Sequence, residues 1–213
     1  KQTVTLSYKE LYGKVESLAS SMRKIGIVKG DRVVGYIPNI PEAIIAMLAT
    51  SSIGAIWSST SPDFGVKGTL DRFTQIKPKL IFATNGYSYN GKFHGTLEKL
   101  DKITKKLTSL KKVVIIDHYQ KSENTYVIKD SINYNYFINK HPEQLIFEQL
   151  PFNYPLYILY SSGTTGLPKS IVHSAGGTLI QHLKELYFHC DLHREDRIFY
   201  FTTCGWMMWN WLV

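Results

Sequence analysis

The stretch LYILYSSGTTGLPKS, from Leu156 to Ser170, says more about the fold than any other part of the chain. Its first five residues, Leu156 to Tyr160, are all apolar or aromatic, which is typical of a strand buried on both faces of a sheet. The residues from Ser161 to Ser170 then combine hydroxyl side chains with glycines and Lys169. Glycines let backbone N–H groups approach an anion, hydroxyls donate further hydrogen bonds, and a lysine adds positive charge. The stretch therefore predicts a buried strand that opens into a polyphosphate-binding loop.

Other interpretations of this loop compete with phosphate binding. A Walker A loop would have its second glycine where Pro168 stands, and proline has no N–H to offer a phosphate. The string also lacks the G-x-G-x-x-G spacing of dinucleotide-binding folds. A flexible surface loop would be equally rich in Ser, Thr and Gly. The buried strand before the loop and the Pro-Lys pair at its end favour phosphate binding.

Short apolar runs alternate with segments of helical periodicity along the chain. This alternation predicts crossover units, and right-handed crossovers place helices on both faces of a mostly parallel sheet. The predicted fold class is α/β, with layered, mostly parallel sheets flanked by helices. Residues 85–92 are expected to form a loop and residues 117–155 an irregular connection. Strands are expected at residues 32–37, 55–57, 80–83, 113–116, 156–160, 171–172 and 197–201, and helices at 7–26, 39–54, 61–77, 102–112 and 176–187.

The first helix has clear signals at both ends. Ser7 and Glu10 have the S-x-x-E spacing of a capping box, and Gly26 stands where a helix commonly stops. We therefore expect a helix whose N-terminal amides are satisfied by its own side chains.

Ligands of open α/β sheets bind beyond the carboxyl ends of the strands. Three segments are expected there: the loop after Tyr160, the loop after Ala83, and the Gly205–Trp206 turn after Phe201. Their common placement predicts a single site at one edge of the sheet.

The chain is basic, with a formal net charge of +8 over 213 residues and a pI of about 9.3. A basic surface suits nucleic acids and membranes, and it suits the polyanions ATP and coenzyme A equally well. The apolar runs are too short for a spanning helix, and no basic and aromatic pattern of a single-strand binder is present. We expect no nucleic-acid or membrane partner. The densest basic run is interpreted as a solvated helix face and contains Lys102, Lys105, Lys106, Lys111 and Lys112.

Cysteines and histidines point to neither a disulfide framework nor a metal centre. Cys190 and Cys204 are too few for a framework, which favours reduced thiols and the cytoplasm. His182, His189 and His193 have no H-E-x-x-H or paired C-x-x-C around them, so no metal site is expected. The chain starts at residue 1 without Met and stops at residue 213 without a helix stop signal, so both ends are expected to lie inside a longer protein.

The string S-S-G-T-T-G-x-P-K at residues 161–169 resembles the phosphate-binding signature of the adenylate-forming superfamily. That superfamily includes acyl-CoA synthetases, luciferases and peptide-synthetase adenylation domains. The segments at residues 5–11 and 30–33 are similar to the N-terminal part of acyl-CoA synthetases. Three longer segments, at 54–65, 173–179 and 205–211, resemble the acetoacetyl-CoA synthetases in particular. The resemblance covers nearly the whole chain.

The resemblance implies an ATP-dependent ligase that works in two steps. Acetoacetate would attack ATP to give acetoacetyl-AMP and pyrophosphate, and coenzyme A would then displace AMP. Magnesium is expected with the ATP. By this resemblance the β- and γ-phosphates would be held by Ser161, Ser162, Gly163, Thr164, Thr165, Gly166 and Lys169.

The resemblance also implies a domain division and two further contacts. Residues 1–150 would form a first α/β subdomain of the N-terminal domain, and 151–213 would begin the second, which carries the phosphate loop. Trp206 and Met207 would lie near the acyl pocket, with core packing as the alternative. Tyr89 and Lys92 occupy the place of an Arg-rich loop that contacts coenzyme A in relatives, although only one cation is present here.

The family's adenine-binding segment, hinge and mobile C-terminal domain with its lysine have no counterpart in this chain, which alone is expected to catalyse neither step. Three different functions stay open at this point. They are a ligase for another short-chain acid, a non-catalytic nucleotide-binding relative and a nucleic-acid-binding module.

Overall fold

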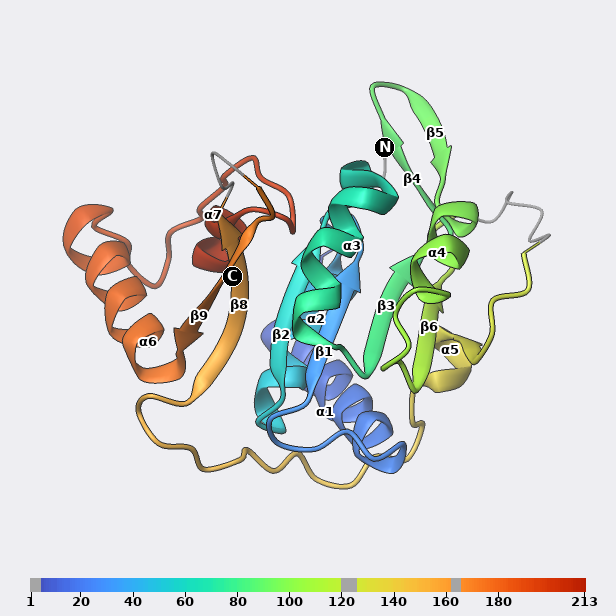
Figure 1. Ribbon diagram of the computed structural model, residues 1–213. Helices are drawn as coiled ribbons and strands as arrows, with labels where there is room; N and C mark the ends of the chain where they lie inside the picture. Colours follow the sequence, from blue (N-terminus) through green and yellow to red (C-terminus); the bar gives the residue numbers. More distant parts are fainter. Residues whose placement is uncertain (1–4, 120–125, 162–165) are drawn as a thin grey trace.

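A seven-stranded sheet forms the centre of the computed structural model, which describes residues 5–119, 126–161 and 166–213 (Figure 1). The strand order is β7-β6-β3-β1-β2-β8-β9, and neighbouring strands run parallel except for the antiparallel pair β8 and β9. This arrangement confirms the predicted mostly parallel α/β fold. The strands are β1 (Arg32–Tyr36), β2 (Ile56–Thr60), β3 (Leu80–Thr84), β6 (Lys112–Ile116), β7 (Ser131–Asn133), β8 (Pro155–Ser161) and β9 (Lys169–Ser174).

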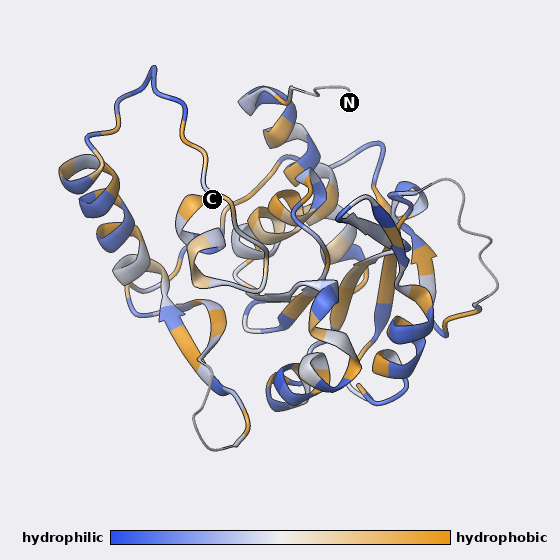
Figure 2. Cartoon of the chain, turned by 90° about the horizontal axis from the view of Figure 1, so that it is seen from above, coloured by the Kyte–Doolittle hydropathy of each residue, from blue (hydrophilic) through white to orange (hydrophobic). Residues whose placement is uncertain are grey.

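Helices cover both faces of this sheet. On one face α1 (Tyr8–Lys24) and α2 (Pro41–Ser52) pack against side chains of the central strands, including Trp57 and Phe82. On the other face α3 (Gly65–Ile76) and α4 (Leu97–Thr104) form a second core with residues of β1, β3 and β6. Apolar residues concentrate in the strands between the two helical layers (Figure 2). Burial on both faces explains why every residue of β3 is buried.

The capping box at the start of α1 is confirmed. The Glu10 N–H donates to Ser7 Oγ at 3.3 Å, and the Ser7 N–H donates to the Glu10 carboxylate at 2.8 Å. Hydrogen bonds from Ser7 lower the pKa of Glu10 below its usual value. At the other end Gly26 has a φ of +76°, a left-handed conformation that glycine adopts without steric cost.

Two expectations about the segments after β3 and after α6 are wrong. Residues 85–92 do not form a plain loop, because β4 (Gly86–Tyr89) and β5 (Lys92–Gly95) pair as a hairpin. Its turn places Asn90 and Gly91 at positive φ, and an Asn-Gly pair between two short strands is the sequence signal for such a turn. Residues 197–201 form no strand, and the side chains of Phe199 and Phe201 are 86% and 83% exposed.

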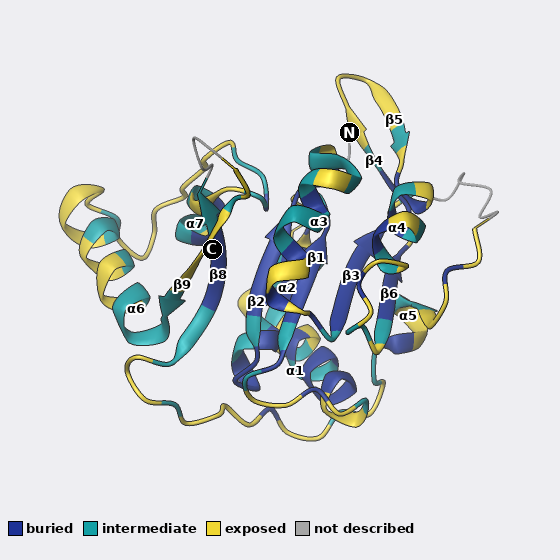
Figure 3. Cartoon of the chain, in the orientation of Figure 1, coloured by how far each residue is buried: buried dark blue, intermediate teal, exposed yellow. Residues whose placement is uncertain are grey.

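Helix boundaries near the carboxyl edge of the sheet also differ from those expected. A 3-10 turn, η1 (Pro62–Phe64), precedes α3, so the α-helix begins at Gly65. After β9 the chain forms α6 (Ala175–Lys184), a π-helical turn η2 (Glu185–His189) and finally α7 (Met207–Leu212). No residue of α6 is buried, and β9 is largely exposed, whereas the central strands are buried (Figure 3).

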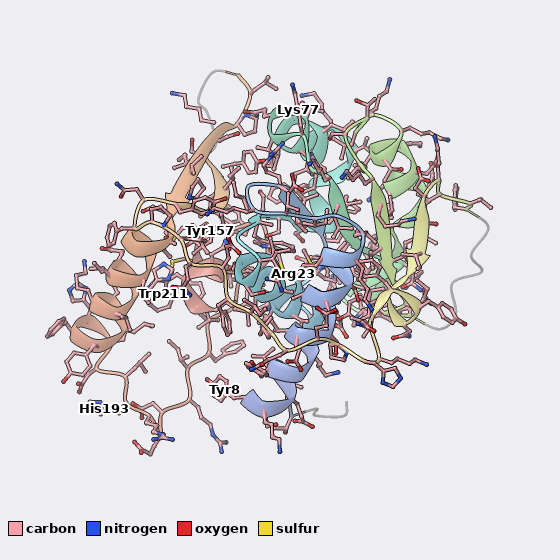
Figure 4. All side chains as sticks on the ribbon, turned by 90° about the horizontal axis from the view of Figure 1, so that it is seen from below. Tyr8, Arg23, Lys77, Tyr157, His193 and Trp211 are labelled. Carbon is pink, nitrogen blue, oxygen red and sulfur yellow. The ribbon has the colours of Figure 1, made fainter. Side chains whose placement is uncertain are left out.

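The connection between β6 and β8 contains two short elements that were not expected, β7 and α5 (Tyr134–Phe137). The rest of it crosses the edge of the sheet opposite the β8–β9 turn (Figure 1). It is held to α1 by Arg23 Nη2, which donates to the carbonyl of Ile146 at 2.8 Å (Figure 4). In the parts of the chain that the structure describes, no helix has the length and apolar character needed to cross a membrane.

Candidate nucleotide-binding site

The two ends of the predicted phosphate loop lie opposite each other on adjacent strands. Ser161 at the end of β8 pairs with Lys169 at the start of β9, and Tyr160 pairs with Ser170. The described ends of the predicted loop therefore lie side by side at the carboxyl end of β8. Ser161 is half-buried and Lys169 is exposed. Of the remaining predicted residues, Ser162, Gly163, Thr164 and Thr165 lie outside the described residues.

Gly166 and Pro168 shape the return of the loop into β9. Gly166 has a φ of +135°, which strongly favours glycine. Pro168 has no N–H, so its carbonyl is the only backbone group it can offer for hydrogen bonding. That carbonyl accepts a hydrogen bond from Gln75 Nε2 at 2.9 Å. Pro168, the residue that excludes a Walker A loop, is thus hydrogen-bonded to α3.

Helix α3 contacts both strands of the hairpin. The hydroxyl of Tyr160 donates to the carbonyl of Arg72 at 3.1 Å, and Ser170 Oγ donates to Gln75 Oε1 at 2.8 Å. The Arg72 guanidinium lies 4.5 Å from the ring centroid of Phe64 and 5.7 Å from that of Tyr160. Sequence reasoning treated α3 only as a core helix and missed Gln75, because no local pattern marks a contact with residues so far along the chain.

The turn at Gly205 reaches the same edge of the sheet by a different route. The hydroxyl of Ser59, in β2, donates to the carbonyl of Cys204 at 2.6 Å, and Trp209 Nε1 donates to Asn39 Oδ1 at 2.9 Å. The backbone of Gly205 packs so closely on the Phe64 ring that a Cβ there would lie 2.2 Å from Cε2. Although Phe201 is not in a strand, the turn does lie beyond the carboxyl ends of β1 and β2.

The two residues predicted for the acyl pocket line different hollows. Met207 lines a cavity of about 500 Å³ whose wall also includes His173 and His182. Tyr157 and Trp211, labelled in Figure 4, line the same cavity. Trp206 is 63% exposed and lines a separate hollow of about 210 Å³ beside Tyr200 and Phe201. The acyl-pocket role of Trp206 and Met207 stays a prediction.

Burial shifts the pKa values of two histidines that line this cavity and of Cys204, which does not line it. Partial burial lowers the pKa of His173 and of His182, so both imidazoles favour the neutral form. The Tyr157 ring lies 5.2 Å from that of His173. Burial raises the pKa of the Cys204 thiol far above its usual value, which keeps that sulfur protonated and unreactive.

Tyr89 and Lys92, predicted to contact coenzyme A, face each other across the tip of the β4–β5 hairpin. The hairpin projects from the same edge of the sheet as the β8–β9 loop (Figure 1). Two strands, β1 and β2, separate β3 from β8, so the hairpin and the loop are not adjacent. Tyr89 is 68% exposed. A coenzyme A contact at Tyr89 and Lys92 remains a prediction.

Two lysines of the basic run form ion pairs with acidic residues close to them in the sequence. Lys102 and Lys105 of the basic run form ion pairs with Glu98 and Asp101 one helical turn earlier, at 2.5 and 2.7 Å. Leu97, Leu100 and Ile103 on the opposite side of α4 are buried, so Lys102 does lie on a solvated helix face. The helix expected at 102–112 is otherwise wrong, because α4 ends at Thr104 and Lys112 begins β6. Within residues 5–119, 126–161 and 166–213, no group of three or more His, Cys, Asp or Glu side chains is arranged to hold a metal ion.

The family model for AMP-binding enzymes matches residues 1–213. The chain belongs to the AMP-binding enzyme family. It is 54% identical over 218 residues to acetoacetyl-CoA synthetase of Mus musculus, covering 100% of this chain and 32% of that protein. It is 44% identical over 217 residues to malonamoyl-CoA synthetase vrtB of Penicillium aethiopicum, covering 98% of this chain and 30% of that protein.

A solved structure of this family has the same fold as the chain. Acetoacetyl-CoA synthetase from Streptomyces lividans superposes with a TM-score of 0.93 and 43% identity, covering 99% of this chain and 32% of that one. The chain therefore spans about a third of the length of the relatives it matches.

Proposed function

We propose that this chain carries the phosphate-binding part of an ATP-dependent acid–thiol ligase that forms acetoacetyl-CoA from acetoacetate, ATP and coenzyme A. The observation that carries the proposal is the β8–β9 hairpin, which brings Ser161 and Lys169 to the same position at the carboxyl edge of a parallel sheet. Similarity to acetoacetyl-CoA synthetases over the whole chain supports the choice of acid.

The proposed reaction has two balanced steps. In the first, a carboxylate oxygen of acetoacetate attacks the α-phosphorus of ATP, the bond to the bridging oxygen of the β-phosphate breaks, and pyrophosphate leaves. In the second, the sulfur of coenzyme A attacks the acyl carbon, AMP leaves, and the thiol proton is released. Both steps depend on positioning and on compensating negative charge.

The loop residues would act on the departing pyrophosphate. The Lys169 ammonium and the Ser161 hydroxyl, with backbone N–H groups of the loop, would donate to oxygens of the β- and γ-phosphates. Negative charge accumulates there as the α–β bond breaks, so these donors favour the first step. Magnesium would arrive bound to ATP, because Mg²⁺ in nucleotide sites is usually held by substrate phosphates, waters and one or two carboxylates.

The remaining assignments rest on family likeness. Trp206 and Met207 would bound the acyl group, and Tyr89 and Lys92 would meet coenzyme A. Residues 1–150 would be the first subdomain and 151–213 the start of the second, with the catalytic lysine in a C-terminal part of the complete protein. Both cysteines are free thiols, which supports the cytoplasm as the location.

An acid panel on the complete protein tests the proposal. Acid-dependent exchange of labelled pyrophosphate into ATP is measured with acetoacetate, malonamate, acetate and butyrate. We expect the highest kcat/KM with acetoacetate. A higher value with malonamate would move the assignment to the acid named for the Penicillium relative, and no exchange with any acid would refute a ligase.

A lysine substitution tests the role of the loop. Lys169→Ala is expected to weaken ATP binding about 10- to 100-fold, the loss that goes with one charge-assisted hydrogen bond, and to leave AMP binding unchanged. Lys9→Ala removes another exposed lysine, on α1, and serves as the matched control. Equal losses of ATP and AMP affinity in Lys169→Ala would contradict the contact with the outer phosphates.

A further inference from the structure

One side chain on α3, Gln75, is hydrogen-bonded to the chain on both sides of Lys169. Its Nε2 donates to the carbonyl of Pro168 at 2.9 Å, and its Oε1 accepts from Ser170 Oγ at 2.8 Å. Nε2 also donates to the carbonyl of Asp71 at 2.6 Å, within the helix. A flipped amide would point its oxygen at the carbonyl of Pro168, so the three contacts fix a single orientation.

These contacts join the start of β9 to α3, in addition to the pairing of β9 with β8. Lys169 and Ser170 are exposed, and Pro168 has no N–H with which to pair across the hairpin. Because β9 is a strand, the side chains of Ser170 and Lys169 point to opposite faces. Gln75 thus holds the backbone from the Ser170 side and leaves the lysine side chain free on the other.

The strand leading into the loop is attached to the same turn of α3. Tyr160, directly opposite Ser170, donates its hydroxyl to the carbonyl of Arg72. Both strands of the hairpin are therefore hydrogen-bonded to the turn from Arg72 to Gln75, while β8 is also paired with β2. Burial raises the pKa of Tyr160 to about 12, so its hydroxyl stays protonated and able to donate at neutral pH.

We propose that Gln75 is a positioning residue for the phosphate site: by fixing the backbone at Pro168 and Ser170 it sets the point from which the Lys169 ammonium reaches the outer phosphates of a nucleoside triphosphate. This inference rests on the proposed function of the loop. It goes beyond that function, because it assigns selectivity between tri- and monophosphate to a helix residue that touches no substrate. AMP lacks the outer phosphates, so its affinity is independent of Gln75.

Releasing this segment has a measurable effect on affinity. Fixing the backbone of one residue corresponds to a factor of about 5 to 30 in an equilibrium constant. Without Gln75 the backbone around Lys169 must become ordered when the ligand binds. Gln75→Ala is therefore expected to weaken ATP and pyrophosphate about 5- to 30-fold and to raise the KM for ATP by a similar factor. The KM values for the acid and for coenzyme A stay at the wild-type level.

The test uses the complete protein and three variants. Gln75→Ala removes all three contacts, and Ser170→Ala removes one of them without changing α3. Thr74→Ala is the matched control, since Thr74 is exposed on the same helix and, among the described residues, donates only to Leu70 within it. Calorimetry measures ATP, pyrophosphate and AMP binding, and hydrogen exchange measures amide protection in residues 166–174. Gln75→Ala should show faster exchange there, Ser170→Ala a smaller change in the same direction, and Thr74→Ala none.

The outcomes separate this inference from the ligase assignment. If the protein exchanges pyrophosphate with acetoacetate but Gln75→Ala and Ser170→Ala both match Thr74→Ala, positioning by Gln75 is refuted and the ligase stands. If no acid supports exchange while pyrophosphate binding still depends on Gln75, the ligase assignment fails and the positioning role stands. If Gln75→Ala lost ATP and AMP affinity equally, Gln75 would only stabilise the fold, and the inference would be overturned. Should Gln75→Ala not fold, a Ser170→Ala protein with wild-type selectivity between ATP and AMP would overturn it as well.

Discussion

Replacing Gly35 by alanine tests how tightly the central strand packs beneath the site edge. Gly35 lies in β1 between Ser59 of β2 and Phe82 of β3. A Cβ at this position would lie 2.9 Å from Trp57 Cη2, 3.0 Å from Trp57 Cζ2 and 2.9 Å from Ile37 Cγ2. Trp57 and Ile37 are both 0% exposed, so neither side chain has space into which it can move.

The expected magnitude combines two opposing terms. An extra methyl group in a filled core costs about 1–3 kcal/mol, and the loss of glycine's freedom in the unfolded chain offsets about 0.4–1 kcal/mol of that. Gly35→Ala should therefore lower the free energy of unfolding by roughly 0.5–2 kcal/mol, which corresponds to about 1–8 °C in Tm for a chain of this size.

Gly13→Ala is the matched control, because Gly13 lies in α1 and has nothing within 4 Å of an added Cβ. Alanine is the better helix former, so this variant should gain about 0.5–1 kcal/mol. Urea denaturation and calorimetry measure the change in the free energy of unfolding for each variant, and the two changes should have opposite signs. In a Trp57→Phe background the cost of Gly35→Ala should shrink, since the indole atoms that it would meet are absent. Stabilisation by both alanines would refute the close packing of β1 against Trp57.

Three further variants probe the cap, the ion pair under β1 and a buried hydroxyl. Ser7→Ala removes the acceptor of the capping box and should lower the free energy of unfolding by about 0.5–2 kcal/mol in urea; no change would show that the cap is frayed in solution. The Asp31 side chain is 6% exposed and lies 2.6 Å from Lys79 Nζ, so Lys79→Ala leaves its carboxylate with the Val28 N–H as its one remaining partner among the described residues, at a cost of about 1–3 kcal/mol. A Lys79→Ala protein as stable as wild type would show that the pair contributes nothing. For Tyr160, whose pKa is raised by burial to about 12, the folded state keeps a proton that the unfolded state releases from about pH 10. Stability should therefore fall as pH rises through that window, and Tyr160→Phe should make the fall shallower; an unchanged slope would place the hydroxyl in solvent.

The sequence alone determined those features whose causes are local. Five successive apolar residues at 156–160 predict the buried strand β8, and the Ser7–Glu10 spacing predicts the start of α1. Alternation of strand and helix patterns predicts the parallel sheet, because a parallel connection needs a crossover helix. Residue chemistry, together with the resemblance to the adenylate-forming signature, predicts a phosphate-binding loop at 161–169. The β4–β5 hairpin could also have been predicted from the sequence, because Asn90-Gly91 is a typical signal for its turn.

Only the tertiary structure decided which distant segments meet. The apolar run at 197–201 has the composition of a strand, but a strand also needs a partner, and these residues pair with no strand of the described sheet. Gln75 joins Pro168 and Ser170 across 93 and 95 residues of sequence. Such contacts leave no periodic trace in the chain, because they depend on where the sheet order places α3 beside β8 and β9. Local side-chain chemistry determined most of the elements and predicts the phosphate-binding loop, whereas long-range packing determined which residues hold the described ends of that loop.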